Sequence, residues 1–346
     1  ITRAATHLYI SYPVFSNEGK NLEPSMFIAE ISDKHPEIVS QSVSFTAEEI
    51  FDFQALQFLE QTPQIEPAEE EFISALLEKF SMNVTALNNY LKCPLQFYYQ
   101  NLIRIPSGKN EATEFGSAVH YALEKLFRNM QDAGKEVFPP KEEMLANFSW
   151  YLKKHRENFT KEAFDRRMEY GNEVLTNYYN KYINTWNKVV AVERNIRAVV
   201  VNGIPLKGKL DKLEFNGNLV NVVDYKTGDI DKATPKLKAP NDKDPNGGDY
   251  WRQAVFYKIL IDNYNQKDWR VISTEFDFVE PDKKKEYRKE KIVILPQDTE
   301  TVKHQITEVW DKIQARDFYT GCGKEDCHWC NFVKDNKLAV ALHDID

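Results

Sequence analysis

The residues best placed to do chemistry lie in the segment 207–228, KGKLDKLEFNGNLVNVVDYKTG. Two strand-like runs flank the Asn-Gly-Asn at 216–218, a composition that supplies the positive φ needed by a hairpin loop. If the last two of these residues form the turn, Asp211 lies directly opposite Asp224, and if the first two do, the carboxylates are diagonal neighbours. Either register puts both carboxylates and Lys226 on one face, because side chains alternate along a strand.

This grouping indicates a divalent cation. Two carboxylates so close repel each other unless a cation lies between them, and Mg²⁺ or Mn²⁺ prefers such oxygen ligands. The ammonium group would hold a water molecule or offset the charge of a phosphate. The alternative is a surface hairpin with scattered charges. Against it, Leu219, Val220, Val222 and Val223 make the second strand apolar on both faces, as in a buried central strand. Buried Asp and Lys side chains need a reason.

Two further motifs flank the hairpin in the sequence. Gln253 and Tyr257 are one helical turn apart in WRQAVFYKIL, and His120 ends an upstream GSAVH. The ordered set resembles the RecB-like branch of the PD-(D/E)XK nucleases over about residues 82–335. The resemblance implies an α/β fold with a restriction-endonuclease-like core, in which helices flank a mixed central sheet, together with an additional helical region.

The resemblance also implies a role for each residue. One or two Mg²⁺ or Mn²⁺ ions are expected on His120, Asp211, Asp224 and the backbone carbonyl of Tyr225. The expected catalytic set is Lys226, Asp211, Asp224, Gln253 and Tyr257. Glu193 matches a glutamate often found at this place in the family, either as a further acidic ligand or as a structural partner. The implied activity is metal-dependent exonucleolytic hydrolysis of DNA in repair and recombination, without a covalent intermediate.

Four cysteines, Cys93, Cys322, Cys327 and Cys330, form a second candidate centre. The CxxxxCxxC spacing of the last three suits one metal centre, and a [4Fe–4S] cluster or Zn²⁺ would each take four thiolates. Two disulfides would also use four cysteines, but an intracellular DNA enzyme lies in a reducing compartment, where disulfides are disfavoured. Resemblance to AddAB-type nucleases implies a structural [4Fe–4S] cluster that closes a loop of over 200 residues. Those relatives show CxxCxxxxxC, a difference that leaves zinc, or His328 as a substitute ligand, as alternatives.

The first 31 residues carry a different resemblance. The TRA sequence containing Arg3 resembles the last conserved motif of UvrD-like superfamily 1 helicases, and residues 21–31 resemble the segment after that motif. We therefore expect residues 1–31 to end a helicase domain, 32–82 to be a helical linker, 83–335 the nuclease domain and 336–346 a tail. No GxxxxGK[ST] loop is present, so this piece should not hydrolyse ATP alone.

Composition sets limits on partners. A net charge of −8 argues against a surface that coats nucleic acid non-specifically, although it is compatible with a local basic channel. No apolar run approaches the roughly 18 residues of a membrane span, so we expect no membrane contact. The resemblance to DNA nucleases implies an intracellular enzyme, and we therefore expect a cytoplasmic location. The expected partners are single-stranded or duplex-end DNA, the helicase region of the same polypeptide and a second helicase–nuclease subunit. The alternatives are a catalytically inactive DNA-binding clamp and a zinc-stapled interaction domain.

Overall fold

The computed structural model describes residues 10–15, 20–22, 24–39, 41–46, 49, 62–106, 108, 110–134, 136–336 and 338. The chain divides into two compact units, residues 1–60 and 61–346. The described part of the first unit includes helix α1, Met26–Lys34. The predicted helicase motif around Arg3 lies outside the described residues, and so does most of the predicted tail.

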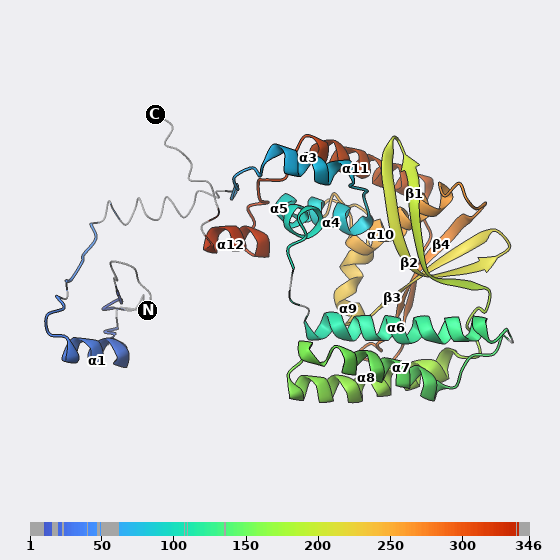
Figure 1. Cartoon of the computed structure of the whole chain (residues 1–346), viewed down its shortest axis with the longest axis horizontal. Helices are drawn as coiled ribbons and strands as arrows, with labels where there is room; N and C mark the ends of the chain where they lie inside the picture. The colour runs from blue at the N-terminus through green and yellow to red at the C-terminus, as the bar shows by residue number, and fades with distance from the viewer. Residues whose placement is uncertain are drawn as a thin grey trace. The chain divides into compact units, whose positions relative to one another are not determined.

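The second unit is built on one five-stranded sheet in the order β1-β2-β3-β4-β5 (Figure 1). The strands are β1 Val190–Val201, β2 Ile204–Asn216, β3 Leu219–Lys226, β4 Arg270–Phe278 and β5 Lys289–Ile292. The first three strands pair antiparallel, β3 and β4 pair parallel, and β5 returns antiparallel. The predicted mixed sheet is therefore confirmed.

Both hairpin turns of the sheet follow from local composition. Asn202 and Gly203, between β1 and β2, both have positive φ, of 51° and 78°, as a two-residue type I′ turn requires. Gly217, with φ of 64°, opens the turn between β2 and β3. Asn216 pairs with Leu219, so the turn is Gly217-Asn218. Of the two registers that the sequence allowed, the one with Asp211 opposite Asp224 is present.

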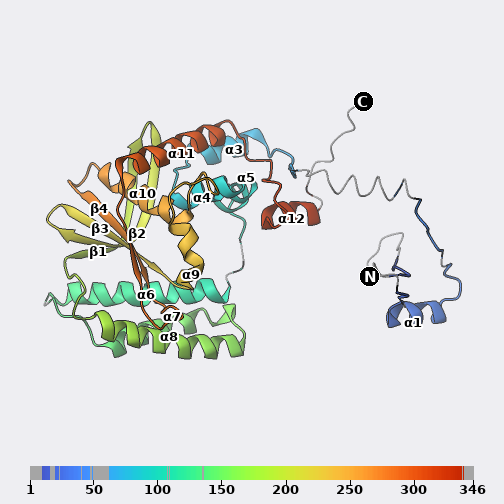
Figure 2. The same cartoon turned by 180° about the vertical axis from the view of Figure 1, so that it is seen from behind.

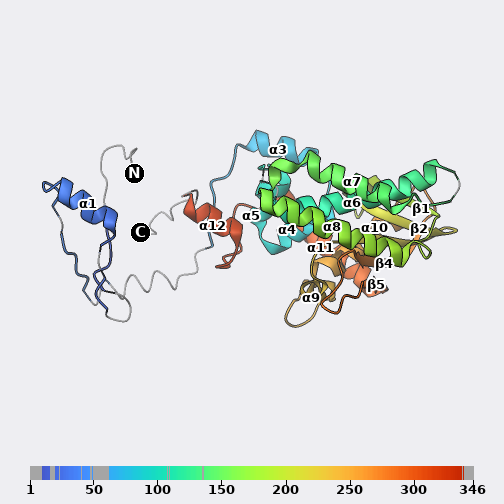
Figure 3. The ribbon, with the colours of Figure 1, turned by 90° about the horizontal axis from the view of Figure 1, so that it is seen from below.

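Two layers of helices cover the sheet (Figures 1 and 2). The first layer is α6 Glu111–Asp132, α7 Lys141–Lys154 and α8 Lys161–Tyr182, which run side by side in Figure 3. Its apolar residues, such as Leu123 and Phe127, share a core with Val223 and Tyr225 of β3. Of these, α7 and α8 are the additional helical region predicted from the sequence, and α6 is the helix that carries His120.

The second layer is α4 Val84–Lys92, α10 Asp249–Asp262 and α11 Pro296–Gln314. It packs on Val220 and Val222 of β3, so the central strand is buried on both faces as its sequence predicted. Shorter elements complete the unit: α3 Glu70–Glu78, α5 Pro94–Phe97, a π-helix Tyr98–Leu102, α9 Ile230–Ala233, 3₁₀ turns Arg156–Asn158 and Thr234–Leu237, and α12 His328–Asp335.

Asn83 caps the start of α4, where its side-chain oxygen accepts a hydrogen bond of 2.8 Å from the amide of Ala86. Asparagine is a favoured cap because its carbonyl reaches back to the third helical amide. Pro94 begins a new short helix, so Cys93 lies between α4 and α5. None of the helices within the described ranges has the length and apolar character needed to cross a membrane.

Candidate active site

Three acidic residues form a row across neighbouring strands. Val192 pairs with Lys212 and Arg194 pairs with Leu210, so Glu193 on β1 lies opposite Asp211 on β2. The last ladder pair of the next hairpin is Lys212 with Val223, which puts Asp211 opposite Asp224 on β3. Sheet register alone therefore aligns Glu193, Asp211 and Asp224.

The row lies where β2 and β3 begin to separate. Beyond Lys212 and Val223 the ladder stops, and the Oδ2 atom of Asp211 accepts a hydrogen bond of 2.9 Å from the amide of Tyr225. A side chain thus takes the place of a backbone carbonyl as acceptor. The ring of Tyr225 packs in the α6 layer. Its predicted role as a carbonyl ligand remains a prediction.

His120 reaches the row from α6. Its Nδ1 atom is 3.4 Å from Oδ2 of Asp211. His120, Glu193 and Asp211 each offer a ligand atom within 4.8 Å of the others. This compact group contains Glu193 rather than Asp224. The sequence left open whether Glu193 is a ligand or a structural partner, and its position in the group makes it a potential ligand.

Asp224 is instead surrounded by donors. Its Oδ1 atom accepts from Nε2 of Gln253 at 2.9 Å and from the hydroxyl of Tyr257 at 3.0 Å, and its Oδ2 atom lies 2.8 Å from Nζ of Lys226. Nζ of Lys226 also donates to Oε1 of Gln253 at 3.0 Å. Gln253 and Tyr257 lie on one face of α10, as their one-turn spacing predicted, and both reach the carboxylate of Asp224.

Aromatic rings form the outer wall around the ammonium of Lys226. Its Nζ atom is 4.3 Å from the ring centroid of Tyr250 and 5.3 Å from that of Phe276. The rings shield the ammonium from water while their faces favour a cation. Sequence reasoning did not identify this pair, because Phe276 lies on β4, which only the parallel crossover brings beside β3. Tyr250 lies three residues before Gln253 on α10, a spacing that could have indicated it.

The electrostatics of the row show an excess of negative charge. Burial alone would lower the pKa of His120, but the carboxylates of Asp211, Asp224 and Glu193 outweigh it and raise the pKa to about 9. Burial also raises the pKa of Asp224 and of Glu193, and in both cases the negative charge of Asp211 adds to the rise. Asp211 has a lowered pKa because His120, the amide of Tyr225 and Lys226 outweigh its burial.

The donor set fits a hard divalent cation. Two carboxylates and one imidazole are ligands that Mn²⁺ accepts, and carboxylate oxygens suit Mg²⁺. Carboxylates that are buried together resist ionisation unless a cation compensates them. A dication among His120, Glu193 and Asp211 would offset the charge of Asp211, which adds to the burial that raises the pKa of Glu193 and of Asp224.

Two neighbouring charges have structural partners. Glu124, one helical turn after His120 on α6, forms an ion pair of 2.7 Å with Arg128. Lys209, which the sequence did not single out, forms an ion pair with Glu193. Lys209 lies two residues before Asp211 on β2, so both side chains point to the same face of the strand. This alternation of side chains could have identified Lys209 from the sequence.

The four cysteines also meet. Their Sγ atoms all lie within 4.8 Å of one another, with 3.9 Å between Cys93 and Cys330 and 3.8 Å between Cys322 and Cys330. All four are free thiols. Stacking of Tyr99 on Trp329, with centroids 5.0 Å apart, holds the two distant segments together beside them. His328, the alternative ligand, is not in the group.

The spacing of the thiols can be compared with the two predicted centres. Four thiolates about 2.3 Å from a single tetrahedral ion stand about 3.8 Å apart, which matches the Cys93–Cys330 and Cys322–Cys330 separations. A four-iron cube binds one cysteine at each iron, so its ligands stand farther apart. Three of the thiols come from the loop before α12 and from its first turn, where Cys322 and Cys327 are only partly buried.

Comparison with known proteins gives a family. The sequence profile of the PD-(D/E)XK nuclease superfamily matches residues 81–334. The matched region contains the row of acids, the donors on α10 and all four cysteines. Together with the mixed sheet and its flanking helices, this match accounts for the fold.

Two individual proteins are also similar. An ATP-dependent helicase/deoxyribonuclease subunit of Carboxydothermus hydrogenoformans is 22% identical over 307 residues, and the match covers 66% of this chain but only 27% of that protein. The chain thus spans about a quarter of this relative's length. A crystal structure of a putative exonuclease from Eubacterium rectale aligns with a TM-score of 0.47 and 13% identity, over 82% of this chain and 97% of that one.

Proposed function

Since this chain belongs to the PD-(D/E)XK nuclease superfamily, we propose that it is a metal-dependent nuclease that hydrolyses phosphodiester bonds in DNA. The observation that carries the proposal is the row Glu193–Asp211–Asp224 with Lys226 ion-paired to its last member. Three aligned carboxylates without a cation would repel one another and destabilise the folded protein. Their alignment therefore favours a site that is completed by a metal ion and a phosphate.

His120, Glu193 and Asp211 would hold the metal, with Asp224 next to them in the row. A bound Mg²⁺ or Mn²⁺ supplies Lewis-acid stabilisation of the charge on the phosphate. Lys226 places a positive charge at the row, where it can position a water or offset the developing negative charge. Gln253 and Tyr257 keep the carboxylate of Asp224 oriented through their hydrogen bonds. Hydrolysis by water requires no covalent intermediate.

The cysteine centre and the partners complete the proposal. We infer that the four cysteines bind a structural metal centre, either the [4Fe–4S] cluster that the resemblance implies or a single Zn²⁺, for which the thiol separations are already suitable. The relative named as a helicase/deoxyribonuclease subunit supports a place for this chain in a helicase–nuclease assembly. Exonucleolytic action in DNA repair and recombination and a cytoplasmic location belong to the same proposal.

A cleavage assay with matched variants tests the activity. Wild-type protein with Mg²⁺ or Mn²⁺ should degrade labelled linear single-stranded or duplex DNA, and a circular substrate distinguishes exonuclease from endonuclease action. Lys226→Ala and Asp224→Asn should each lower kcat at least about 100-fold, because an interaction made in the transition state is lost. Lys312→Ala, an exposed lysine paired with Glu308, should leave kcat unchanged.

Two outcomes would count against the proposal. Undiminished cleavage by both active-site variants would remove Lys226 and Asp224 from the reaction. Tight DNA binding by the wild-type protein without cleavage in either metal would support the inactive clamp instead.

A further inference from the structure

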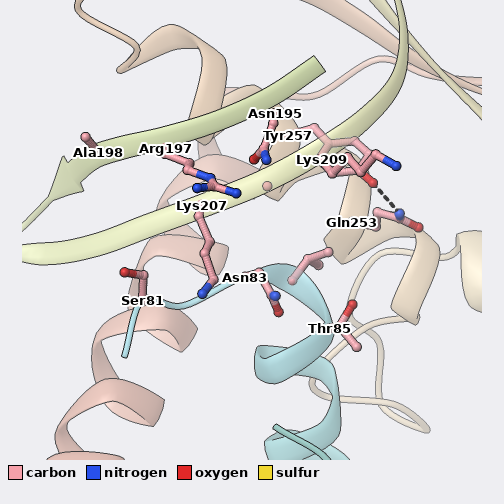
Figure 4. Close-up of a pocket in the computed structure, with 12 residues that line it drawn as sticks. Ser81, Asn83, Thr85, Asn195, Arg197, Ala198, Lys207, Lys209, Gln253 and Tyr257 are labelled. Carbon is pink, nitrogen blue, oxygen red and sulfur yellow. Dashed lines mark hydrogen bonds between the residues drawn. The ribbon is translucent and has the colours of Figure 1, made fainter. Parts of the chain in front are cut away.

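A groove of about 580 Å³ opens beside the row of acids, between β1, β2 and the start of α4 (Figure 4). We call it the basic groove, and its charged side chains are Arg197, Lys207 and Lys209. Gln253 and Tyr257 line it as well, so it is continuous with the donors around Asp224. Neither the family match nor the relatives assign a role to this groove.

A β-bulge builds the first wall of the groove. Ile196 pairs with Gly208 and Val199 pairs with Leu206, so two residues of β1, Arg197 and Ala198, face a single residue of β2, Lys207. Ala198 has a left-handed φ of 58°, which a β-branched or bulky residue would resist. Such bulges redirect a side chain, and here Arg197 and Lys207 both line the groove.

The segment before α4 builds the second wall. The amide of Met82 donates to the carbonyl of Pro205 at 2.9 Å, and the amide of Lys207 donates to the carbonyl of Met82 at 2.9 Å. This pairing fixes the first turn of α4 beside Lys207, with Ser81, Asn83 and Thr85 lining the groove (Figure 4). Hydroxyl and amide groups and the positive end of the nine-residue helix therefore face the two cations.

The two cations are not neutralised by the protein. Neither Arg197 nor Lys207 makes an ion pair within the described part of the chain, whereas Lys209 is paired with Glu193. Burial lowers the pKa of Lys207, and the positive charges of Arg104 and Arg197 lower it further. In a chain of net charge −8, a cluster of unpaired cations that repel one another is stabilised by an anion from outside.

We propose that the basic groove binds a phosphate group of the nucleic-acid strand that is cleaved at Asp224 and Lys226, with Arg197 and Lys207 as the cationic contacts. The proposal rests on the proposed nuclease function, because that function identifies the anion as part of a substrate strand. The groove adjoins Gln253 and Tyr257, so the phosphate it holds is close along the strand to the scissile one. It is either an internal diester or a terminal monoester.

Binding of labelled oligothymidylate in a Lys226→Ala background tests this without cleavage. Adding Arg197→Ala and Lys207→Ala should weaken binding about 10- to 100-fold at low salt. The slope of log K against log[salt] should become shallower by about 0.7 for each phosphate of a single strand that the variant no longer binds. Arg288→Ala with Lys312→Ala removes the same charge from two exposed sites and should change affinity less than twofold. Arg197→Lys with Lys207→Arg should bind nearly as the parent does.

The source of the phosphate is tested on the same proteins. We would compare oligonucleotides that carry a 5′-phosphate or a 5′-hydroxyl, and others with one neutral methylphosphonate at successive positions. At one position, loss of the negative charge should weaken binding by the parent but not by the Arg197→Ala, Lys207→Ala variant. A terminal position identifies a monoester, and an internal one a diester.

Equal affinity and equal salt slope for the groove variant and its Arg288, Lys312 control would overturn the proposal, provided that both melt at the parent temperature. If the groove variant melts lower, the charge-retaining variant decides: loss of binding by that variant as well contradicts a charge-based contact. Failure of the wild-type protein to cleave DNA with Mg²⁺ or Mn²⁺ contradicts the nuclease function alone, because binding through the groove is measured without cleavage.

Discussion

At the scale of single residues, Glu193 is the most informative side chain. It has a left-handed φ of 49°, a conformation that costs a non-glycine residue about 1–3 kcal/mol and that clusters at functional sites. It also lies opposite Asp211 and within ligand distance of His120. Its ion pair with Lys209 would by itself suit a purely structural partner. A metal titration separates the two interpretations that the sequence left open.

We expect Glu193→Gln to raise the Mn²⁺ concentration for half-maximal cleavage at least about tenfold, because a ligand oxygen loses its charge, while kcat at saturating Mn²⁺ falls less. The matched control is Glu124→Gln, since Glu124 pairs with Arg128 instead. Mn²⁺ titrations of cleavage and calorimetry of metal binding provide the readout. Equal Mn²⁺ requirements for both variants would make Glu193 a structural partner of Lys209.

At the scale of elements, the site depends on how closely α10 approaches the sheet. Gln253 and Tyr257 on α10 reach Asp224 on β3, and the same helix rests on β2 where Gly208 faces Leu260. A Cβ atom on Gly208 would lie 2.6 Å from Cδ2 of Leu260, closer than atoms can pack. The glycine therefore sets the distance between the donors on α10 and the acids on the strands.

Gly208→Ala should lower the free energy of unfolding by about 1–3 kcal/mol through overpacking. It should also lower kcat, because a displaced α10 lengthens the hydrogen bonds to Asp224. Adding Leu260→Val should restore part of both. Gly108→Ala, whose new methyl would meet no atom within 4 Å, is the control. Chemical denaturation and cleavage rates test this prediction. An unchanged stability of Gly208→Ala would show that Gly208 does not set the distance between α10 and β2.

At the scale of the whole second unit, the cysteine centre joins the beginning of the nuclease region to its end. Cys93 follows α4, and the other three cysteines surround the start of α12. Other contacts make the same connection: the hydroxyl of Tyr90 donates to the carbonyl of Asp317 at 2.5 Å. A metal centre would add a cross-link to segments that already pack together.

Metal analysis and an absorbance spectrum of anaerobically purified protein should find either about four irons with sulfide per chain or one zinc. Removing the centre, by chelation or by Cys93→Ser, should lower the free energy of unfolding by about 5 kcal/mol, the size expected when a cross-link over such a long loop is lost. His328→Ala should retain the metal, because His328 is outside the group of thiols. Metal-free native protein of undiminished stability would rule out a structural centre.

Much of the fold could be predicted from the sequence. The 207–228 hairpin, the buried central strand and the helix carrying Gln253 and Tyr257 all follow from patterns shorter than 25 residues. Turn composition and side-chain periodicity are local, so the chain's own residues encode them. The same is true of the juxtaposition of Asp211, Asp224 and Lys226, which one hairpin register produces.

The tertiary structure decided what lies around that hairpin. The alignment of Glu193 with Asp211 depends on the register of β1 on β2, and the meeting of Cys93 with Cys322, Cys327 and Cys330 depends on packing between the ends of the unit. Arg197 comes to lie beside Lys207 because β1 has one extra residue at the bulge. This extra residue shifts every following side chain of β1 to the other face of the sheet. Local composition specifies which chemical groups are available, whereas only long-range pairing brings them within a few ångströms of one another.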